Sequence, residues 1–549
     1  MSKGNPLTGN TLSRRAVMAG GVAMTAALMG CGPGTDTEPG AGTGGESAAG
    51  AFETPTFKAF EGLSPLVPGD DNGVIPGYAT YPEPIEREGY PLPEIEPFSI
   101  MLQANPPAEA PEQNRNYQQV FEAMGTPFET IFGGGVTYTD KFQVTMAGND
   151  IPDIVQMIST AKLPQLLEKN FSDLSDILGG DGVLEYPGLA NIPTAAWGIP
   201  QVDGRLWGIT KPSPPSGRVM TSRGDIFERK GVDPNPVLNS GEDFVDMLTE
   251  LTDKGANEFA LGSDPTEWLL QAVYEMQDGG PNGWRKEADG TFTNEITSPQ
   301  MVRALEEATK IVQAGLIHPQ SFSDPGQNAV WFSAGTTATY LQSFVGWGGH
   351  ARSKPEWKVG NVVLPKWDGG GTYAMHKSGG GYYAYMAFKK QDSEKRLREL
   401  LKIADYVASP FGTTQYLDLV YGTPGYTYEM VDGNPQSIED SSKFLVQGLT
   451  YLGGNGNCAL FVPGDEVQVR AMHAFLTEQL PRGVEDDSRG LYSETETGEN
   501  ATWTAKLKEA KRAVMTGDKP VSEWEKTAGE WQAEVGDKIA EEYAAAAAQ

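Results

Sequence analysis

The sequence lacks the residues and motifs on which several functions depend. Of its 549 residues only two are cysteine, Cys31 and Cys458, and only four are histidine, with no two histidines at the spacing of a metal site. No Gly-Lys dipeptide occurs, which excludes a phosphate-binding P-loop, and there is no Gly-x-Ser-x-Gly nucleophile elbow. We therefore expect a chain that hydrolyses no ATP itself and needs neither a metal nor another cofactor.

Basic charge and long apolar runs are also scarce. Lysine and arginine number 42 against 73 aspartates and glutamates, which gives a formal net charge of -31. Because nucleic acids are bound through a basic face, this balance argues against a nucleic-acid partner. The stretch from Ala16 to Gly30 is rich in glycine and alanine and is too short to cross a bilayer core, which needs about 20 apolar residues.

The N-terminus carries the pattern of an export signal. Lys3, Arg14 and Arg15 precede the apolar stretch, and Ser13-Arg14-Arg15 is similar to a twin-arginine (Tat) signal. Leu28-Met29-Gly30-Cys31 resembles the lipobox of bacterial lipoproteins, in which the signal is cut before the cysteine and the cysteine receives lipid. We expect residues 1–30 to be a signal peptide and the rest to be extracytoplasmic and lipid-anchored to the cell membrane through Cys31. An uncleaved membrane anchor is the alternative.

Two segments without helical or strand periodicity follow. Residues 31–50 consist mainly of Gly, Ala, Thr, Ser, Pro and acidic residues and predict a flexible linker. Residues 51–96 are dense in proline. They predict an extended segment, the strap, on the surface of the folded body that residues 97–549 form. The remaining residues exceed what one hydrophobic core accommodates, so two or more lobes are expected.

The body alternates strand-like and helix-like segments. Strands are predicted near 98–103, 128–132 and 151–158, with helices near 117–124 and 141–147 between them, which favours a parallel α/β sheet. Amphipathic helices are predicted where Ser240 provides a cap and apolar residues recur at helical spacing, near 240–251, 301–317 and 394–409.

Several segments, in their order along the chain, resemble the extracellular solute-binding proteins of ABC importers, and in particular the large lipoprotein subgroup that handles oligosaccharides. They include "YTDKFQVTMAGNDIPDIVQM" at 138–157, "VDGRLWGITKP" at 202–212 and "YGTPGYTYEM" at 421–430. The resemblance covers roughly residues 97–545.

This resemblance implies an α/β fold with two lobes, of the periplasmic-binding-protein-like type II, with discontinuous lobes and a hinge. It places lobe 1 at 97–217 and 341–411 and lobe 2 at 218–340 and 412–549. It also implies a receptor, not an enzyme, that captures an oligosaccharide or related sugar in the cleft and delivers it to the transmembrane subunits of an ABC permease. We expect a monomer.

Aromatic residues in glycine-rich loops are candidates for stacking on sugar rings. They are Trp207, Trp284, Trp331, Trp347, Tyr382, Tyr383, Tyr421 and Tyr426. The resemblance places Trp207 and Trp284 in cleft loops, and Trp347 follows an apparent crossover between lobes. For each of these aromatics, packing in the core is the alternative.

Polar candidates lie near strand ends. Gln103, Asn105 and Gln156 follow or end predicted strands, where ligand contacts concentrate. Arg218 could pair with the carboxylate of an acidic sugar, as could Arg223 and Arg352, with ordinary salt bridges as the alternative.

Two other functions stay open at this stage. A secreted glycoside hydrolase or lyase needs only two carboxylates, and the chain has many. A sensor lipoprotein without a transport role could use the same fold.

Overall fold

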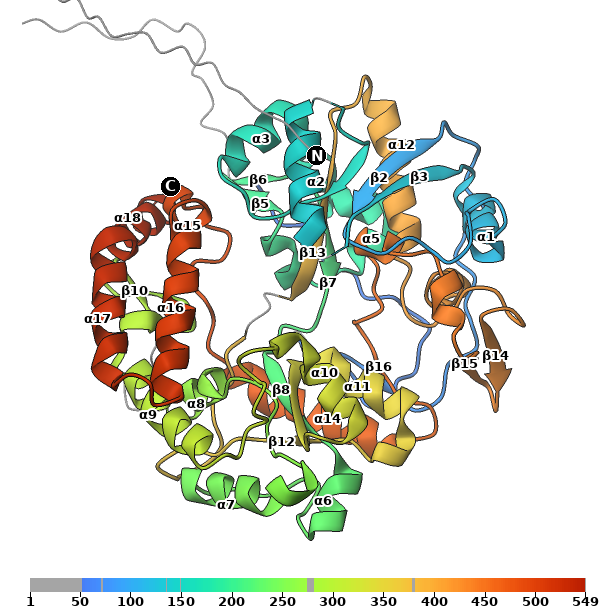
Figure 1. The fold of residues 1–549 in the computed structure, drawn as a ribbon. Helices are drawn as coiled ribbons and strands as arrows, with labels where there is room; N and C mark the ends of the chain where they lie inside the picture. The colour runs from blue at the N-terminus through green and yellow to red at the C-terminus, as the bar shows by residue number, and fades with distance from the viewer. Residues whose placement is uncertain are drawn as a thin grey trace, which may run out of the picture. The chain divides into compact units, whose positions relative to one another are not determined.

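The computed structural model describes residues 52–70, 73–134, 136–148, 150–273, 281–377 and 381–548 (Figure 1). The predicted signal peptide, the lipidation site Cys31 and the linker lie outside these residues.

The first lobe is built on a five-stranded sheet with the strand order β3-β2-β4-β13-β7. Strands β2, β3 and β4 are parallel, as the alternating sequence predicted, whereas β13 runs antiparallel to both β4 and β7. It follows that β2, β3, β4 and β7 all end at the same edge of the sheet. The strands and the helices between them are β2 (Phe98–Leu102), α1 (Arg115–Met124), β3 (Phe128–Phe132), α2 (Val136–Gly148), β4 (Ile154–Gln156), β7 (Ile209–Pro212) and β13 (Tyr382–Phe388).

Helix α12 (Glu394–Val407) shows why the predicted helices form. Ser393 caps the N-terminus of this helix by accepting a hydrogen bond from the backbone N–H of Arg396. The leucines of the helix recur on one face, which is buried in the hydrophobic core of the first lobe, called the first core below, as the core of the second lobe is called the second. Other helices of this lobe are α3 (Leu163–Asn170), α4 (Ser175–Leu178), α5 (Pro187–Ala190) and α13 (Thr414–Val420).

The second lobe has a three-stranded antiparallel sheet with the order β11-β8-β12. Its strands are β8 (Arg218–Ser222), β11 (Thr339–Ser343) and β12 (Gly360–Val362). Its helices include α6 (Gly224–Lys230), α7 (Gly241–Leu251), α8 (Thr266–Val273), α9 (Pro299–Gln313), α10 (Asn328–Ala334), α11 (Phe344–Ser353) and α14 (Glu466–Gln479). Ser240 caps α7 as predicted, its side chain accepting from the N–H of Asp243.

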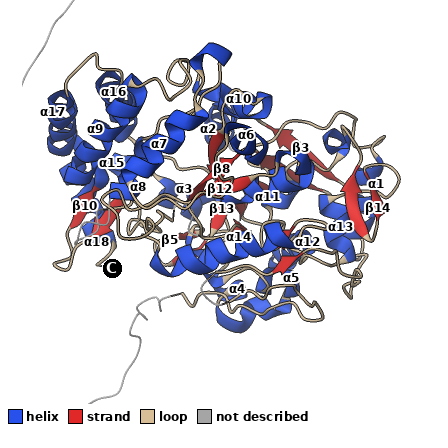
Figure 2. Ribbon diagram, turned by 90° about the horizontal axis from the view of Figure 1, so that it is seen from below, coloured by secondary structure: helices blue, strands red, loops and turns tan. Residues whose placement is uncertain are grey.

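The C-terminal helices extend this second lobe. Figure 2 shows α16 and α17 beside α9, and their tryptophans join the same core as the β9–β10 hairpin. These elements are β9 (Trp284–Lys286), β10 (Phe292–Asn294), α15 (Glu494–Thr497), α16 (Asn500–Met515), α17 (Val521–Trp531) and α18 (Asp537–Ala546).

The predicted lobe boundaries need correction in two places. Residues 341–375, assigned to lobe 1 from the sequence, belong to lobe 2, because β11 and β12 pair with β8 and the side chains around them join the second core. Residues 412–452, assigned to lobe 2, contribute Leu419, Leu449 and Leu452 to the first core. From Phe98 onward, the described chain therefore passes between the lobes at three crossovers. They lie between Pro212 and Arg218, between Met375 and Tyr382, and between Leu452 and Leu460.

The proline-rich segment runs as extended chain along both lobes and has no helix within its described residues. The N–H of Thr56 bonds to Gly180 in the first lobe, and β1 (Gly77–Tyr78) then pairs in parallel with β16 (Leu460–Phe461). Farther on, Arg87 forms a buried ion pair of 2.6 Å with Asp405 of α12. Beyond what the sequence suggested, this segment contacts the first lobe, the second lobe and then the first again.

Candidate functional site

The edge where β2, β3, β4 and β7 end is the part of the first lobe from which the chain leaves for the second. In open α/β sheets, ligands bind in the crevice beyond the carboxyl ends of the strands. Gln103 and Asn105 follow β2, Gln156 ends β4, Lys211 is next to last in β7, and Tyr382 begins β13 at the same edge. The structure thus brings four of the predicted site residues to one edge and adds Lys211, which the sequence had not singled out.

These predicted polar residues differ in exposure. Gln156 is buried, and its side-chain oxygen accepts a 2.8 Å hydrogen bond from the backbone N–H of Gln103. Its own carbonyl accepts a hydrogen bond from the hydroxyl of Tyr138. Gln156 therefore links β2 to β4, whereas Gln103 and Asn105 carry exposed side chains.

A cavity of about 270 Å³ lies between the two lobes beside Tyr382. The segment 195–201 and Tyr382 line it from the first lobe, Pro215 from the first crossover, and Glu485, Arg489 and Gly490 from the second lobe. Nearby, the N–H of Lys162 donates a 2.7 Å hydrogen bond to the hydroxyl of Tyr492, which is a further contact between the lobes.

The charges in this cavity are arranged around one carboxylate. Glu485 pairs with Lys377 at 2.7 Å and with Arg489 at 2.6 Å, so that two cations share a single acid. The backbone carbonyl of Lys377 also accepts a hydrogen bond from Arg489. Burial raises the pKa of Tyr382, so its hydroxyl is neutral and able both to donate and to accept. These groups suit hydroxyl-bearing ligands.

Three of the predicted tryptophans are in the hydrophobic cores instead. Trp207 is 4% exposed and its ring N–H donates to the carbonyl of Val202, while Trp284 packs near Trp531 in the second core. Trp347 is 3% exposed and donates to Gln468. A ring covered on both faces offers no platform to a sugar, so the alternative of core packing holds for these three residues.

The remaining predicted residues also have protein partners. Arg218 begins β8, the central strand of the second sheet, and pairs with Glu267 at 2.8 Å. Arg223 pairs with Asp225, and Arg352 donates to the carbonyl of Phe461. Tyr421 is the C-cap residue that follows α13, and it packs against a cluster of aromatic side chains beside the strap. The ordinary ion pairs considered for Arg218 and Arg223 are therefore present.

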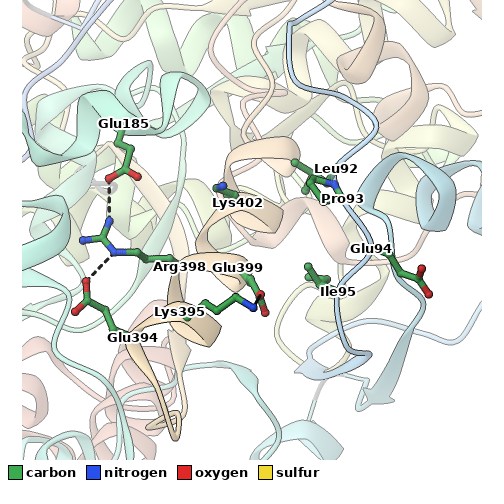
Figure 3. Close-up of a pocket in the computed structure, with 10 residues that line it drawn as sticks. All are labelled: Leu92, Pro93, Glu94, Ile95, Glu185, Glu394, Lys395, Arg398, Glu399 and Lys402. Atoms are coloured by element: carbon green, nitrogen blue, oxygen red, sulfur yellow. Dashed lines mark hydrogen bonds and ion pairs between the residues drawn. The ribbon is translucent and has the colours of Figure 1, made fainter.

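A second cavity, of about 590 Å³, lies on the first lobe alone (Figure 3). It is lined by residues 92–95 of the strap and by the polar face of α12. Figure 3 shows Arg398 held between Glu185 and Glu394, and each of these hydrogen bonds is 2.8 Å long. Because this guanidinium already pairs with carboxylates and no part of the second lobe contributes, this cavity is a weaker candidate for the site.

The described residues contain neither a metal-binding group of side chains nor a membrane-spanning helix. Among them no three His, Cys, Asp or Glu side chains are grouped so as to hold a metal ion. Likewise, none of the helices in the described ranges combines the length and the apolar character needed to cross a bilayer.

Comparison with known proteins identifies relatives of this fold. No family model matches the chain. The polygalacturonan/rhamnogalacturonan-binding protein YtcQ of Bacillus subtilis is 21% identical over 457 residues, which are 79% of this chain and 88% of that protein.

Among solved structures, the alginate-binding protein AlgQ2 without calcium ion has a TM-score of 0.60 at 14% identity and covers 84% of this chain and 100% of its own. The N-glycan transport solute binding protein NgtS of Streptococcus pneumoniae, in complex with Man1GlcNAc, has a TM-score of 0.55 at 13% identity. The match covers 83% of this chain and 100% of NgtS. A solute-binding protein of Bifidobacterium longum infantis that is associated with an ABC transporter has a TM-score of 0.54 at 13% identity. The match covers 82% of this chain and 98% of that protein. These likenesses confirm the predicted α/β fold with two lobes, that of the solute-binding proteins.

Proposed function

We propose that this chain is the solute-binding receptor of an ABC transporter, which captures an oligosaccharide between its two lobes and delivers it to a membrane permease. The observation that carries the proposal is the two-lobe fold, with the carboxyl edge of its first sheet and a cavity lined from both lobes at the same place.

The names of the relatives favour a saccharide as the solute. YtcQ is described as binding polygalacturonan and rhamnogalacturonan, AlgQ2 as binding alginate, and NgtS is in complex with Man1GlcNAc. All three names describe binding, and none describes the cleavage of a bond. We therefore propose a receptor that leaves its ligand intact, in place of a glycoside hydrolase or lyase.

The N-terminal pattern supports a place outside the cytoplasm. A signal cut before Cys31, lipid on that cysteine and the linker at 31–50 would tether a monomeric body to the membrane that contains the permease. This position suits a receptor that captures solute outside the cell and passes it on.

A thermal-shift screen of oligosaccharides with the soluble body tests the proposal. A ligand that binds only the folded state stabilises it by about 2.7 kcal/mol at 100 times its Kd. We expect acidic oligosaccharides such as oligogalacturonates to raise the unfolding temperature, and chromatography of the sugar after long incubation to recover it unchanged. Failure of every oligosaccharide to stabilise the protein would contradict a sugar receptor, and the appearance of shorter products would favour an enzyme.

A further inference from the structure

A lysine and two tyrosines form a cluster in the first lobe. The ammonium nitrogen of Lys211 lies 4.5 Å from the ring centre of Tyr451 and 5.5 Å from that of Tyr383. The two rings are stacked, with centres 5.6 Å apart and planes 12° from parallel. Both lysine distances are within the range of cation–π attraction.

The members of this cluster come from three places in the chain that are each next to a crossover. Lys211 is followed by Pro212, where β7 ends before the first crossover, and Tyr383 is the second residue after the second crossover. Tyr451 ends the short helix Leu449–Tyr451, just before the third crossover. Figure 1 shows β7 and β13 side by side where the chain leaves for β8. The cluster therefore lies at the junction with the second lobe.

Tyr383 is turned out of the regular strand. The pairing of β13 with β7 shifts between Tyr382 and Ala384, so that Tyr383 is the extra residue of a β-bulge. Bulges redirect side chains and occur next to functional sites. Here residue Tyr383 is 62% exposed, although large apolar side chains are usually buried. The stack with Tyr451 and the Lys211 contact hold it in place, and the ring still has surface open to a ligand.

Lys211 has no counter-charge in the part of the chain that the structure describes. No carboxylate there pairs with its ammonium, and burial alone lowers its pKa from 10.5 to about 8. Tyr451 supplies no negative charge, because burial and then the neighbouring Tyr383 raise its pKa to about 12. A half-buried cation without an anionic partner is unfavourable, because it has lost water and gained no opposite charge. An anion bound beside it would supply that charge.

We propose that Lys211, Tyr383 and Tyr451 form a subsite for a sugar ring that carries a carboxylate. The ammonium pairs with the carboxylate, and the open face of Tyr383 packs against the C–H face of the ring. This inference rests on the proposed function and narrows the ligand class to acidic oligosaccharides. No bond of the ligand is made or broken at this subsite.

Calorimetric titration with a matched pair of ligands tests the subsite. The probes are trigalacturonate and its fully methyl-esterified form, which differ in charge and share the same rings. The proteins are the wild type, Lys211→Met, Lys211→Arg and Tyr383→Ala. As a control, Lys506→Met removes an exposed lysine that lies 3.8 Å from the ring centre of Trp503 in the second lobe.

We expect the wild type to prefer trigalacturonate by about tenfold or more. Lys211→Met should remove that preference and leave affinity for the ester unchanged, whereas Lys211→Arg and Lys506→Met should keep the preference. Tyr383→Ala should weaken both ligands. Equal affinity of the wild type for the two ligands, or equal losses for both in Lys211→Met, would overturn the subsite while leaving a sugar receptor intact. If neither these probes nor any neutral oligosaccharide binds the wild type, the proposed function itself fails.

Discussion

Replacing Lys211 by methionine should stabilise the protein in the absence of ligand. The pKa of Lys211 is lowered from 10.5 to about 8 by burial. Since each pH unit corresponds to about 1.36 kcal/mol, the charged lysine destabilises the fold by at most about 3.4 kcal/mol at neutral pH. Solvent screening and the loss of the contacts with Tyr383 and Tyr451, about 1 kcal/mol, reduce the expected gain to about 1 to 2 kcal/mol.

The sign of the pH dependence follows from linkage. Between pH 8 and 10.5 the unfolded chain keeps a proton on Lys211 that the folded chain has released, so wild-type stability rises with pH in this window. Lys211→Met lacks this dependence. Its advantage over the wild type should therefore be complete at pH 7 and should vanish as the pH approaches 10.5.

Scanning calorimetry of both proteins at pH 7 and pH 10 measures the effect. For a body of this size the unfolding entropy converts 1 kcal/mol into roughly 1 °C, so we expect the unfolding temperature of Lys211→Met to lie about 1 to 2 °C above the wild type at pH 7. The difference should be close to zero at pH 10. Lys506→Met, which removes an exposed charge, should show no such dependence. A Lys211→Met protein that is less stable than the wild type at pH 7 would refute an uncompensated charge at this position.

Three further predictions concern the ion pair between the strap and α12, the tryptophans of the second core, and the lipid anchor. Asp405→Ala should lower the free energy of unfolding by about 3 to 5 kcal/mol because it leaves the buried Arg87 without a carboxylate. Arg87→Met should cost less because Asp405 keeps the hydrogen bonds from Tyr90 and Gly188. Denaturant titration of both variants compares them, and equal losses would contradict this reasoning. Trp284→Ala and Trp347→Ala should each lower the free energy of unfolding by about 3 to 5 kcal/mol while the folded protein keeps its affinity for sugar. Denaturant titration and calorimetric titration measure the two effects, and a loss of affinity without a loss of stability would indicate that these tryptophans contact the ligand. Cys31→Ala should move the protein from the detergent phase to the aqueous phase in a phase-partition assay, and an unchanged distribution would argue against lipidation.

Local patterns allowed much of the fold to be predicted. The cap at Ser240 and the apolar face of 394–409 depend on neighbours within one or two turns, and α7 and α12 form as expected. The strands near 98–103 and 128–132 were predicted for the same reason. The assignment of segments to lobes depends instead on pairing between distant strands, and the sequence contains no local signal for the pairing of β11 with β8.

The candidate site was predicted less completely. Strand ends indicated Gln103, Asn105 and Gln156, and these residues lie at one edge of the sheet with Tyr382, which the sequence indicated as a loop aromatic. Contact of these residues with a ligand stays a prediction. Large aromatic residues in glycine-rich loops suggested open platforms, yet Trp207, Trp284 and Trp347 fill the cores because burial of such rings is favourable. Tyr383, one of the loop aromatics that the sequence indicated, is exposed, and its orientation is set by a bulge that depends on the register of β13 against β7.

The central claim, capture of a sugar between the lobes, is tested most directly by filling the cavity there. Gly198 lines that cavity, and a β-carbon added to it would meet no atom within 4 Å, so Gly198→Trp places a large side chain there without strain in the backbone. Gly529 of α17 is equally open and lies away from the cavity, so Gly529→Trp is the matched control. Calorimetric titration with the oligosaccharide that most stabilises the wild type should show at least a tenfold loss of affinity in Gly198→Trp and no change in Gly529→Trp. Unchanged affinity in a folded Gly198→Trp protein would contradict capture in this cavity.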